Sequence, residues 1–295
     1  MLFASIDIGT NAVRLFFANV FEKKGSTSVE KASLIRIPLR LGEDVFSIGY
    51  ISIEKTRKLL DTMKAFKLLI DVYEPVNYIA CATAAMREAS NSIEIIEKIR
   101  KEANLEIRII DGIEEANILG ATNNINVSGK HNLSMYVDVG GGSTEISIVL
   151  NHKMIDSISF KIGTIRLLNE KVENCEWESL KTWLKKYKND FGKVFLIGSG
   201  GNINKISKIY GDNISNTLNY SDIKKAFSHL NKYTLNERIE LLGMRPDRAD
   251  VILPAATIFI SIMKWAKIDS IYVPKIGLAD GLIHKLFNEY TDSIK

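Results

Sequence analysis

The chain has 295 residues, of which 46% are hydrophobic and 25% are charged. This composition excludes a disordered or fibrous protein, and the length exceeds what one hydrophobic core usually organises, so two domains are expected. The formal net charge of +4 arises from 39 basic and 35 acidic residues without a dense basic block, which argues against a nucleic-acid partner.

The cysteines and the N-terminal segment bear on location. The two cysteines, Cys81 and Cys175, lie far apart and match neither a redox nor a zinc-binding spacing. We therefore expect no disulfide framework and a reducing compartment. The N-terminal segment carries Asp7 and lacks a basic region, and no apolar run in the sequence is long enough to cross a bilayer. Together these features predict a cytoplasmic location without a membrane partner.

Strands and helices are expected to alternate over residues 1–125. Apolar runs rich in β-branched and aromatic residues predict three strands, at Leu2–Ile8, Val13–Val20 and Ser33–Leu39. Ser52 is a candidate N-cap for a helix whose apolar side chains recur at three-to-four spacing up to Tyr73. The pattern then predicts a strand at Asn77–Cys81, a helix at Ser92–Asn104 capped by Asn91 with Glu94, a strand at Glu106–Ile110 and a helix from Glu114 to about Ile125. Helices between strands favour βαβ crossovers and a mainly parallel sheet.

The second half of the sequence repeats the plan of the first. A polar connection at residues 123–132 is followed by a strand at Met135–Val139 that ends in Asp138-Val139-Gly140, as the first strand ends in Asp7-Ile8-Gly9. A second strand and a third, at Lys153–Phe160, follow in the same order. The remaining pattern predicts a helix at Trp177–Asn189, a strand at Val194–Ile197, a helix after the turn Gly198–Gly201, helices at Ser221–Lys232 and Pro246–Lys267, a strand at Ile271–Val273 and a last helix from about Leu278. We therefore expect two similar α/β domains, residues 1–125 and 126–295, with a central cleft and with the last helix able to pack back on the first domain.

The run from Asp138 to Glu145 carries the most chemistry in the sequence. It contains three consecutive glycines, Gly140, Gly141 and Gly142, followed by Ser143 and Thr144. Such a turn is favourable only where the backbone requires positive φ or must approach a ligand closely, and its free N–H groups form a concave nest for phosphate oxygens. The hydroxyls can add donors, and the flanking carboxylates can hold a hard divalent cation. The alternative is a glycine-rich β-hairpin with an incidental acid at each end.

Two further turns are candidates for holding phosphate. The first hairpin carries Asp7, Gly9, Thr10 and Asn11 at matching positions, and it would grip a phosphate chain from the opposite domain. By itself, this motif is at least as consistent with a structural hairpin. The other candidate turn comprises Gly198, Ser199, Gly200 and Gly201. It lies between a strand and a helix, where free amides and the helix dipole favour an anion, and a tight connection alone is the alternative.

Arg87 and the pair Glu114-Glu115 complete the candidates. Arg87 follows a strand directly, at the sheet edge where α/β proteins bind ligands. Its guanidinium matches phosphate geometry, although a surface ion pair also explains a lone arginine. Hydrolysis of a phosphoanhydride requires a group that accepts a proton from water, and either glutamate could serve. Acids in the first turn of a helix also stabilise it through the macrodipole, so both explanations stay open.

Several of these motifs, in this order, resemble the exopolyphosphatase and guanosine pentaphosphate phosphohydrolase family, Ppx/GppA. The resemblance runs over almost the whole chain. Its motifs are Ile6–Asn11, Ala82–Ala84 with Arg87–Asn91, Gly112 with Glu114–Ala116, Asp138–Glu145, Gly163 with Arg166-Leu167, Gly198–Gly201 and Arg248–Asp250. It implies two actin-like domains of the sugar kinase, Hsp70 and actin type, with ribonuclease H-like cores. It also implies release of terminal phosphate in the presence of Mg²⁺ or Mn²⁺.

The resemblance assigns roles by matching position. Glu115 is similar to the family's catalytic glutamate, Arg87 to a phosphate-contacting arginine, and Asp138 and Glu145 to its metal-associated carboxylates. Asp7, Thr10 and Asn11 resemble the family's first phosphate turn. A homodimer is a further implication of the resemblance.

Two departures from the family pattern stand out. Long members carry further helical domains after this core, whereas the printed sequence ends at Lys295, so we expect a short form. Near this end, Lys275 stands where an acid is common and Ala279 where an arginine is common. These departures leave the preferred substrate and its chain length open.

The leading hypothesis is a hydrolase that removes terminal phosphate from inorganic polyphosphate or guanosine pentaphosphate. An ATP-dependent small-molecule kinase is a second hypothesis, because proteins of the same fold bind ATP between similar turns. A non-catalytic polyphosphate or nucleotide sensor is a third. The presence of Glu115, Asp138 and Glu145 favours the hydrolase.

Overall fold

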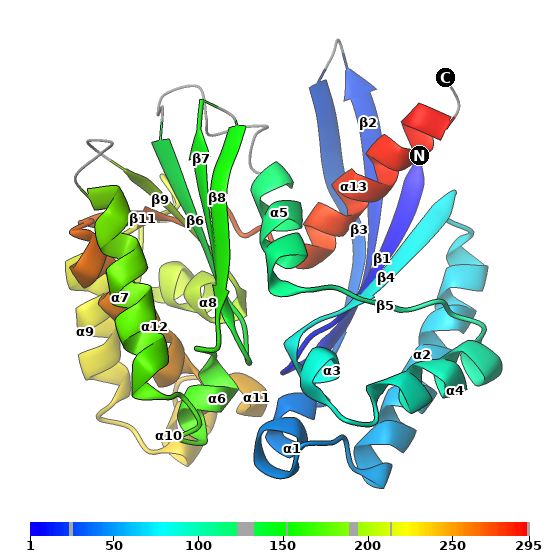
Figure 1. The fold of residues 1–295 in the computed structure, drawn as a ribbon, viewed down its shortest axis with the longest axis horizontal. Helices are drawn as coiled ribbons and strands as arrows, with labels where there is room; N and C mark the ends of the chain where they lie inside the picture. The colour runs from blue at the N-terminus through cyan, green and yellow to red at the C-terminus, as the bar shows by residue number, and fades with distance from the viewer. Residues whose placement is uncertain (24–25, 123–132, 152, 189–193, 213, 294–295) are drawn as a thin grey trace. The chain divides into compact units, whose positions relative to one another are not determined.

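The computed structural model of the chain describes residues 1–23, 26–122, 133–151, 153–188, 194–212 and 214–293. It consists of two compact α/β units (Figure 1). The first unit contains Met1–Ile125 and Gly277–Lys295, and the second contains Asn126–Ile276. Each unit has one sheet with helices packed on it, which confirms the predicted α/β class.

The first unit is built on a five-stranded sheet of order β3-β2-β1-β4-β5. Its strands are β1 (Leu2–Ile8), β2 (Val13–Lys23), β3 (Ser26–Ile37), β4 (Asn77–Ala82) and β5 (Arg108–Ile109). β1, β2 and β3 pair antiparallel, whereas β4 and β5 continue the sheet in parallel. Its helices are α1 (Leu41–Ile48), α2 (Ile53–Tyr73), α3 (Ala84–Glu88), α4 (Ser92–Ala103), α5 (Gly112–Thr122) and α13 (Leu278–Ser293).

Helix α13 returns from the far end of the sequence to the sheet of the first unit (Figure 1). Its Ile283 and Phe287 pack in one buried cluster with Phe3 of β1, and its Leu282 packs in another with Ile118 of α5. Burial of one such side chain contributes roughly 1.5–3 kcal/mol. This helix therefore joins the two ends of the chain in one core.

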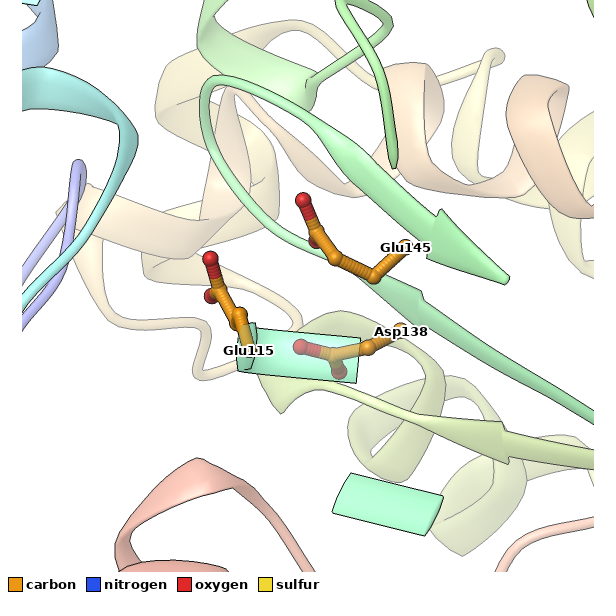
Figure 2. Close-up of side chains that lie close together, drawn as sticks. All are labelled: Glu115, Asp138 and Glu145. Atoms are coloured by element: carbon orange, nitrogen blue, oxygen red, sulfur yellow. The ribbon is translucent and has the colours of Figure 1, made fainter. Parts of the chain in front are cut away.

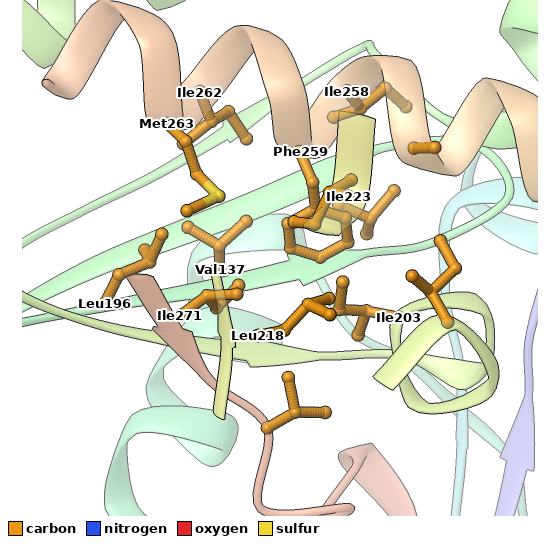
Figure 3. Packing of buried hydrophobic residues seen from close by; sticks show 14 of the residues in the cluster. Val137, Leu196, Ile203, Leu218, Ile223, Ile258, Phe259, Ile262, Met263 and Ile271 are labelled. Carbon is orange, nitrogen blue, oxygen red and sulfur yellow. The ribbon is translucent and has the colours of Figure 1, made fainter. Parts of the chain in front are cut away.

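The second unit is built on a six-stranded sheet of order β10-β11-β9-β6-β7-β8. Its strands are β6 (Leu133–Val139), β7 (Thr144–Leu150), β8 (Lys153–Phe160), β9 (Phe195–Ser199), β10 (Thr217–Asn219) and β11 (Ser270–Tyr272). Its helices are α6 (Thr164–Leu168), α7 (Asn174–Lys188), α8 (Gly201–Tyr210), α9 (Tyr220–Leu230), α10 (Leu235–Glu240), α11 (Pro246–Ala249) and α12 (Ile252–Ala266). Figure 3 shows Phe259 of α12 among strand side chains that include Val137, Leu196 and Ile271. One apolar face of α12 and one face of the sheet therefore share a core.

The opening hairpins of the two units have the same register. In the first unit, Asp7 of β1 lies opposite Arg14 of β2. In the second unit, Asp138 of β6 lies opposite Glu145 of β7. The repeat predicted from the sequence is thus present in the backbone. The residue opposite the aspartate is basic in the first unit and acidic in the second.

Three predictions in the first unit differ from the structure. The sheet is mixed rather than mainly parallel, because β1, β2 and β3 pair antiparallel. The third strand begins at Ser26 rather than Ser33, because its polar first half still pairs with β2. The Asn91 side chain does not cap α4. Its amide instead binds the N–H and the carbonyl of Ile51, at 3.0 and 2.8 Å, and so joins two loops.

Further differences concern helices. The helix expected at Pro246–Lys267 is divided into α11 and α12. At the end of α11, the Ala249 carbonyl accepts a hydrogen bond from the Arg238 side chain at 3.0 Å. The short helices α1, α3, α6 and α10 were not predicted, because five to eight residues show too little periodicity. The connection predicted at residues 123–132 lies outside the described residues.

Contrary to the prediction that no apolar run is long enough to cross a bilayer, the stretch Pro246–Ala266 among the described residues passes this test by length and composition. Half of its most apolar window is buried inside the structure. Phe259, Ile262 and Met263 of this stretch belong to the core of the second unit. Packing within that unit therefore accounts for its apolar character.

We expect the substitution Phe259→Ala to lower the free energy of unfolding by about 3–5 kcal/mol, because it removes a fully buried ring and leaves a cavity. Ile214 is 96% exposed in the same unit and provides the control. Ile214→Ala should change this free energy by less than about 0.5 kcal/mol. Chemical unfolding followed by tryptophan fluorescence measures both values, and equal losses would contradict the assigned core.

Candidate active site

Two acidic side chains lie at the end of the first hairpin of the second unit (Figure 2). Asp138 of β6 and Glu145 of β7 are direct cross-strand partners, and a carboxylate oxygen of one lies within 4.8 Å of an oxygen of the other. The Ser199 hydroxyl donates to Asp138, and the Ser159 hydroxyl donates to Glu145 Oε1 at 2.8 Å. Like charges at directly opposed strand positions repel each other, so this geometry favours a cation beside them.

The equivalent acid of the first unit has a partner of opposite charge. Asp7, which is 2% exposed, forms an ion pair with Arg14 on the neighbouring strand. Arg14 occupies the hairpin position that Glu145 occupies in the second unit. The charge of Asp7 is therefore balanced within its own hairpin, whereas Asp138 lies beside a second acid.

The chemistry of the acidic pair fits a hard divalent cation. Carboxylate oxygens are the ligands that Mg²⁺ and Mn²⁺ prefer, and such ions keep part of their shell for water and phosphate. The hydrogen bonds from Ser199 and Ser159 orient Asp138 and Glu145, as donors behind metal ligands commonly do. The pair can therefore hold a metal ion.

The glycine-rich turn after β9 lies against the acidic pair. Gly200 has a φ of 112°, and a Cβ there would lie 3.0 Å from the Val139 carbonyl oxygen and 3.4 Å from Asp138 Oδ1. Only glycine adopts this conformation without strain. Because Ser199 also binds Asp138, the turn Gly198–Gly201 and the end of β6 form one site within the second unit.

Of the two reasons expected for the triple-glycine turn, positive φ is not observed, and close approach of a ligand stays a prediction. Positive φ angles occur at Gly49, Gly200 and Gly243 among the described glycines, and not in the turn at residues 140–142. A Cβ on Gly163 would lie only 2.3 Å from the Gly142 carbonyl carbon, so two backbone segments are in direct contact here. This contact accounts for the glycine at residue 163.

The two hydroxyls of this turn have different surroundings. Thr144, which we expected to add a donor for phosphate, donates instead to the Ile162 carbonyl. Ser143 closes the turn, because its carbonyl accepts from the Gly140 N–H at 3.0 Å. Thr144 therefore supports the turn from within the unit, and Ser143 remains a candidate for a phosphate contact.

Arg87 and Glu115 lie together in the first unit. Arg87 of α3 donates through Nη1 to the Ile110 carbonyl at 2.7 Å, and the same nitrogen lies 3.9 Å from Glu115 Oε2. Glu115, the third labelled side chain in Figure 2, is in the first turn of α5, with 9% of its side chain exposed. Arg87 therefore contacts both the carboxylate and the backbone that leads into its helix.

The adjacent Glu114 has a different environment. It forms ion pairs with Arg108 at 2.6 Å and with Lys285 of α13 at 2.9 Å. Burial acts to raise the pKa of Glu114, but the hydrogen bonds from Lys285 and Arg108 outweigh it and hold the pKa below its ordinary value. Glu114 is thus engaged structurally, which favours Glu115 as the candidate base.

The predicted site residues fall into two groups, one in each unit. The first unit holds Asp7, Gly9, Thr10, Asn11, Arg87 and Glu115. The second unit holds Asp138, Gly140, Gly141, Gly142, Ser143, Thr144, Glu145, Gly198, Ser199, Gly200 and Gly201. β1 and β4 are parallel neighbours, so the turn after β1 and the segment after β4 lie at the same sheet edge of the first unit.

Sequence reasoning misses three supporting residues, Arg14, Ser159 and Arg166. Arg14 and Ser159 meet their acidic partners only through strand register, which the sequence does not determine. Arg166 belongs to one of the motifs that carry the family resemblance, and this motif could have identified it as a site residue. Its Nε donates to the Gly142 carbonyl at 2.9 Å.

One of the departures near the C-terminus has a structural explanation. Ala279 is 6% exposed and packs in the cluster that contains Phe3, and its carbonyl accepts from the Ser5 hydroxyl at 2.8 Å. A small side chain at this position therefore contributes to the core of the first unit. Lys275 has a φ of 63°, and nothing in the structure explains its departure from the family pattern.

Comparison with known proteins identifies relatives of the whole chain. The model of the Ppx/GppA phosphatase family matches residues 22–289. A bifunctional 3-dehydroquinate synthase/phosphatase of Fusobacterium nucleatum is 30% identical over 92% of this chain, which spans only 44% of that protein. Exopolyphosphatase 1 of Mycobacterium leprae is 22% identical over 97% of this chain and 90% of that protein.

The fold comparison agrees with the sequence comparison. The solved structure of the Aquifex aeolicus member of the Ppx/GppA family superposes with a TM-score of 0.78 at 27% identity, and the match covers 98% of both chains. These matches confirm the predicted fold of two actin-like α/β units and the predicted enzyme class. The chain belongs to the Ppx/GppA phosphatase family.

Proposed function

We propose that the chain is a metal-dependent phosphohydrolase that removes terminal phosphate from inorganic polyphosphate. The observation that carries this proposal is the like-charged pair Asp138 and Glu145 beside the glycine turn at residues 140–142. The similarity to exopolyphosphatase 1 of M. leprae along almost all of both chains supports this substrate. Guanosine pentaphosphate is the second candidate, because both activities give the family its name.

Mg²⁺, or Mn²⁺ in its place, is the proposed metal. Asp138 and Glu145 would hold it, with Ser199 and Ser159 keeping the carboxylates oriented. When bound, a divalent ion of this kind offsets negative charge on phosphate oxygens.

Glu115 is the proposed general base and would accept a proton from the attacking water. Arg87, 3.9 Å from this carboxylate, would orient it and offset charge on the transferred phosphoryl group. This assignment requires the first unit to present Glu115 to a phosphate that is bound by the second unit. Glu114 already forms ion pairs with two cations, which supports the choice of Glu115 rather than Glu114 as the base.

The remaining predicted residues are proposed to hold successive phosphates. They are Asp7, Gly9, Thr10 and Asn11 in one turn, Gly140, Gly141, Gly142 and Ser143 in the second, and Gly198, Ser199, Gly200 and Gly201 in the third. A cytoplasmic location and a homodimer are part of the same proposal. The kinase hypothesis is not favoured, because the family is one of phosphatases.

A substrate panel tests the proposed activity. We expect the protein to release phosphate from long-chain polyphosphate in the presence of Mg²⁺ and to lose this activity in the presence of EDTA. Guanosine pentaphosphate and ATP, the latter with and without acceptor alcohols, are the comparison substrates in a phosphate-release assay. Acceptor-dependent formation of ADP without hydrolysis of polyphosphate would contradict the proposal.

The adjacent glutamates provide a matched pair of variants. Glu115→Gln should lower kcat by roughly 10²- to 10⁴-fold without a change in melting temperature, because a general base is lost. Glu114→Gln should keep kcat and lower stability at pH 7, by up to about 1 kcal/mol, because two partly exposed ion pairs are lost.

The pH dependence separates the two roles further. A lowered carboxylate pKa contributes stability above the unfolded-state pKa, and this contribution is lost as the pH falls. The stability difference between wild type and Glu114→Gln should therefore vanish in acid. Thermal unfolding as a function of pH measures it, and full activity in Glu115→Gln would contradict the assigned base.

Neutralising one acid of each hairpin should have opposite effects on stability. In EDTA, Glu145→Gln should raise the free energy of unfolding, on the order of 1 kcal/mol, because one of two neighbouring like charges is removed. Mg²⁺ should stabilise the wild type by about 2.7 kcal/mol at a concentration 100 times the Kd, and this variant much less.

Asp7→Asn is the matched control in the first hairpin. It breaks the ion pair with Arg14 and should lower stability by roughly 1–3 kcal/mol with or without Mg²⁺. Thermal unfolding with and without the ion measures all of these shifts. The same response in both variants would argue against a cation at Asp138 and Glu145.

A further inference from the structure

All three carbonyls of the triple-glycine turn are bound by the segment that begins α6. The pairs are Thr164 N–H to Gly140 at 3.0 Å, Ile165 N–H to Gly141 at 2.8 Å and Arg166 Nε to Gly142 at 2.9 Å. Two of these donors are backbone amides of a helix start, and the third is a guanidinium. The turn is therefore held from one side by three successive residues.

Because peptide groups are planar, these three hydrogen bonds also determine the direction of the N–H groups in the turn. A trans peptide is planar, and its carbonyl points away from the N–H of the following residue. Fixing the carbonyls of Gly140, Gly141 and Gly142 therefore directs the next three N–H groups to the opposite side. In the part of the chain that the structure describes, the N–H groups of Gly141 and Gly142 donate to no backbone carbonyl. They form a preorganised donor set of the kind that binds phosphate.

Gly163 makes this arrangement possible. A Cβ at this position would lie 2.3 Å from the Gly142 carbonyl carbon and 2.4 Å from the Gly141 carbonyl oxygen. These neighbours are backbone atoms, which cannot move without moving the turn itself. The start of α6 and the turn can thus approach within hydrogen-bond distance only because residue 163 has no side chain.

The first unit holds its own turn in the same way. The Arg40 N–H donates to the Asn11 carbonyl and the Gly42 N–H to the Thr10 carbonyl, both at 3.0 Å. A Cβ on Gly42 would lie 2.2 Å from Thr10 Cγ2. In both repeats, the segment after the third strand therefore fixes the turn after the first strand, through a glycine at the contact.

The second unit has one further hydrogen bond to its turn, which the guanidinium of Arg166 donates. Arg166 is 8% exposed, so its charge is largely withdrawn from solvent. Burial of a charged group is costly unless its donors are satisfied, and here Nε is satisfied by a turn carbonyl. The Arg40 side chain, by contrast, binds Glu43 of α1, the helix that begins directly after it.

We infer that Arg166 is a positioning residue that fixes the phosphate-binding turn. It binds the Gly142 carbonyl, and this orients the N–H of Ser143, while the helix start orients the N–H groups of Gly141 and Gly142. This inference rests on the proposed function, because the oriented N–H groups gain their purpose from a bound phosphate. It adds residues 163–166 to the site without any contact between them and the substrate.

The kinetic test compares two buried arginines of the second unit. Arg166→Met should lower kcat for polyphosphate roughly tenfold to hundredfold with a smaller change in KM, because misdirected donors stabilise the transition state poorly. Arg166→Lys, which can still donate one hydrogen bond, should recover part of this loss.

Arg238→Met is the matched control. Arg238 is 9% exposed and likewise donates to backbone carbonyls, those of Leu230 and Ala249, both at 3.0 Å. This variant should lose thermal stability but keep kcat when it is assayed below its melting temperature. An equal loss of kcat in both methionine variants would assign the effect to general destabilisation and overturn the inference. Wild-type kinetics in Arg166→Met would overturn it as well.

A binding experiment tests the turn without turnover. The probe is inorganic phosphate with Mg²⁺, titrated into protein labelled with ¹⁵N-serine and ¹⁵N-glycine. The Ser143 amide signal should shift in the wild type and in Arg238→Met, and much less in Arg166→Met. The Gly141 and Gly142 signals, whose orientation comes from the helix start, should shift in all three proteins.

The two experiments separate the inference from the proposed function. If the wild type hydrolyses no substrate of the panel, the proposed function fails, but the amide shifts still report on the turn. If the wild-type Ser143 amide does not respond to phosphate, or responds equally in Arg166→Met, the positioning role is wrong even in an active enzyme.

Discussion

The repulsion between Asp138 and Glu145 is the interaction on which the proposed chemistry depends. Two unit charges within 4.8 Å cost about 3–4 kcal/mol at the effective dielectric constant of sites near a protein surface. Hydrogen bonds from Ser199 and Ser159 hold the two carboxylates in place. The hairpin therefore keeps two carboxylates together, and a cation bound between them would offset their repulsion.

The first hairpin shows what the same backbone does without this constraint. Its register is identical, but Arg14 stands where the second hairpin has Glu145, and the ion pair with Asp7 leaves no excess charge. In the proposed function, the first turn would contact phosphate through N–H and hydroxyl groups, and the second would also do so through a metal ion. One reversed charge in a repeated hairpin would therefore give the two units different chemical roles.

The sequence predicted the parts of this arrangement that depend on local patterns. The repeated strand endings identified both turns, and the periodic apolar residues identified the strands and long helices that support them. The partners of the acids could not be predicted, because Arg14 and Ser159 lie seven and fourteen residues away from them and meet them only through strand pairing. Positive φ, one of the two reasons expected for the glycine run, is not observed. The contact of this run with Gly163 could not be predicted, because Gly163 belongs to a segment beyond the third strand.

The choice between Glu114 and Glu115 shows how distant packing decides local chemistry. Adjacent residues on a helix point about 100° apart, so the two carboxylates of α5 face different neighbours. Glu114 faces Lys285, which lies 171 residues further along the chain and is brought there by the packing of α13 on α5. Glu115 faces Arg87 of α3, the short helix that follows β4. Because Lys285 of α13 binds Glu114, the helix that closes the core of the first unit also fixes the surroundings of one glutamate, which supports the proposal that the other acts as the base.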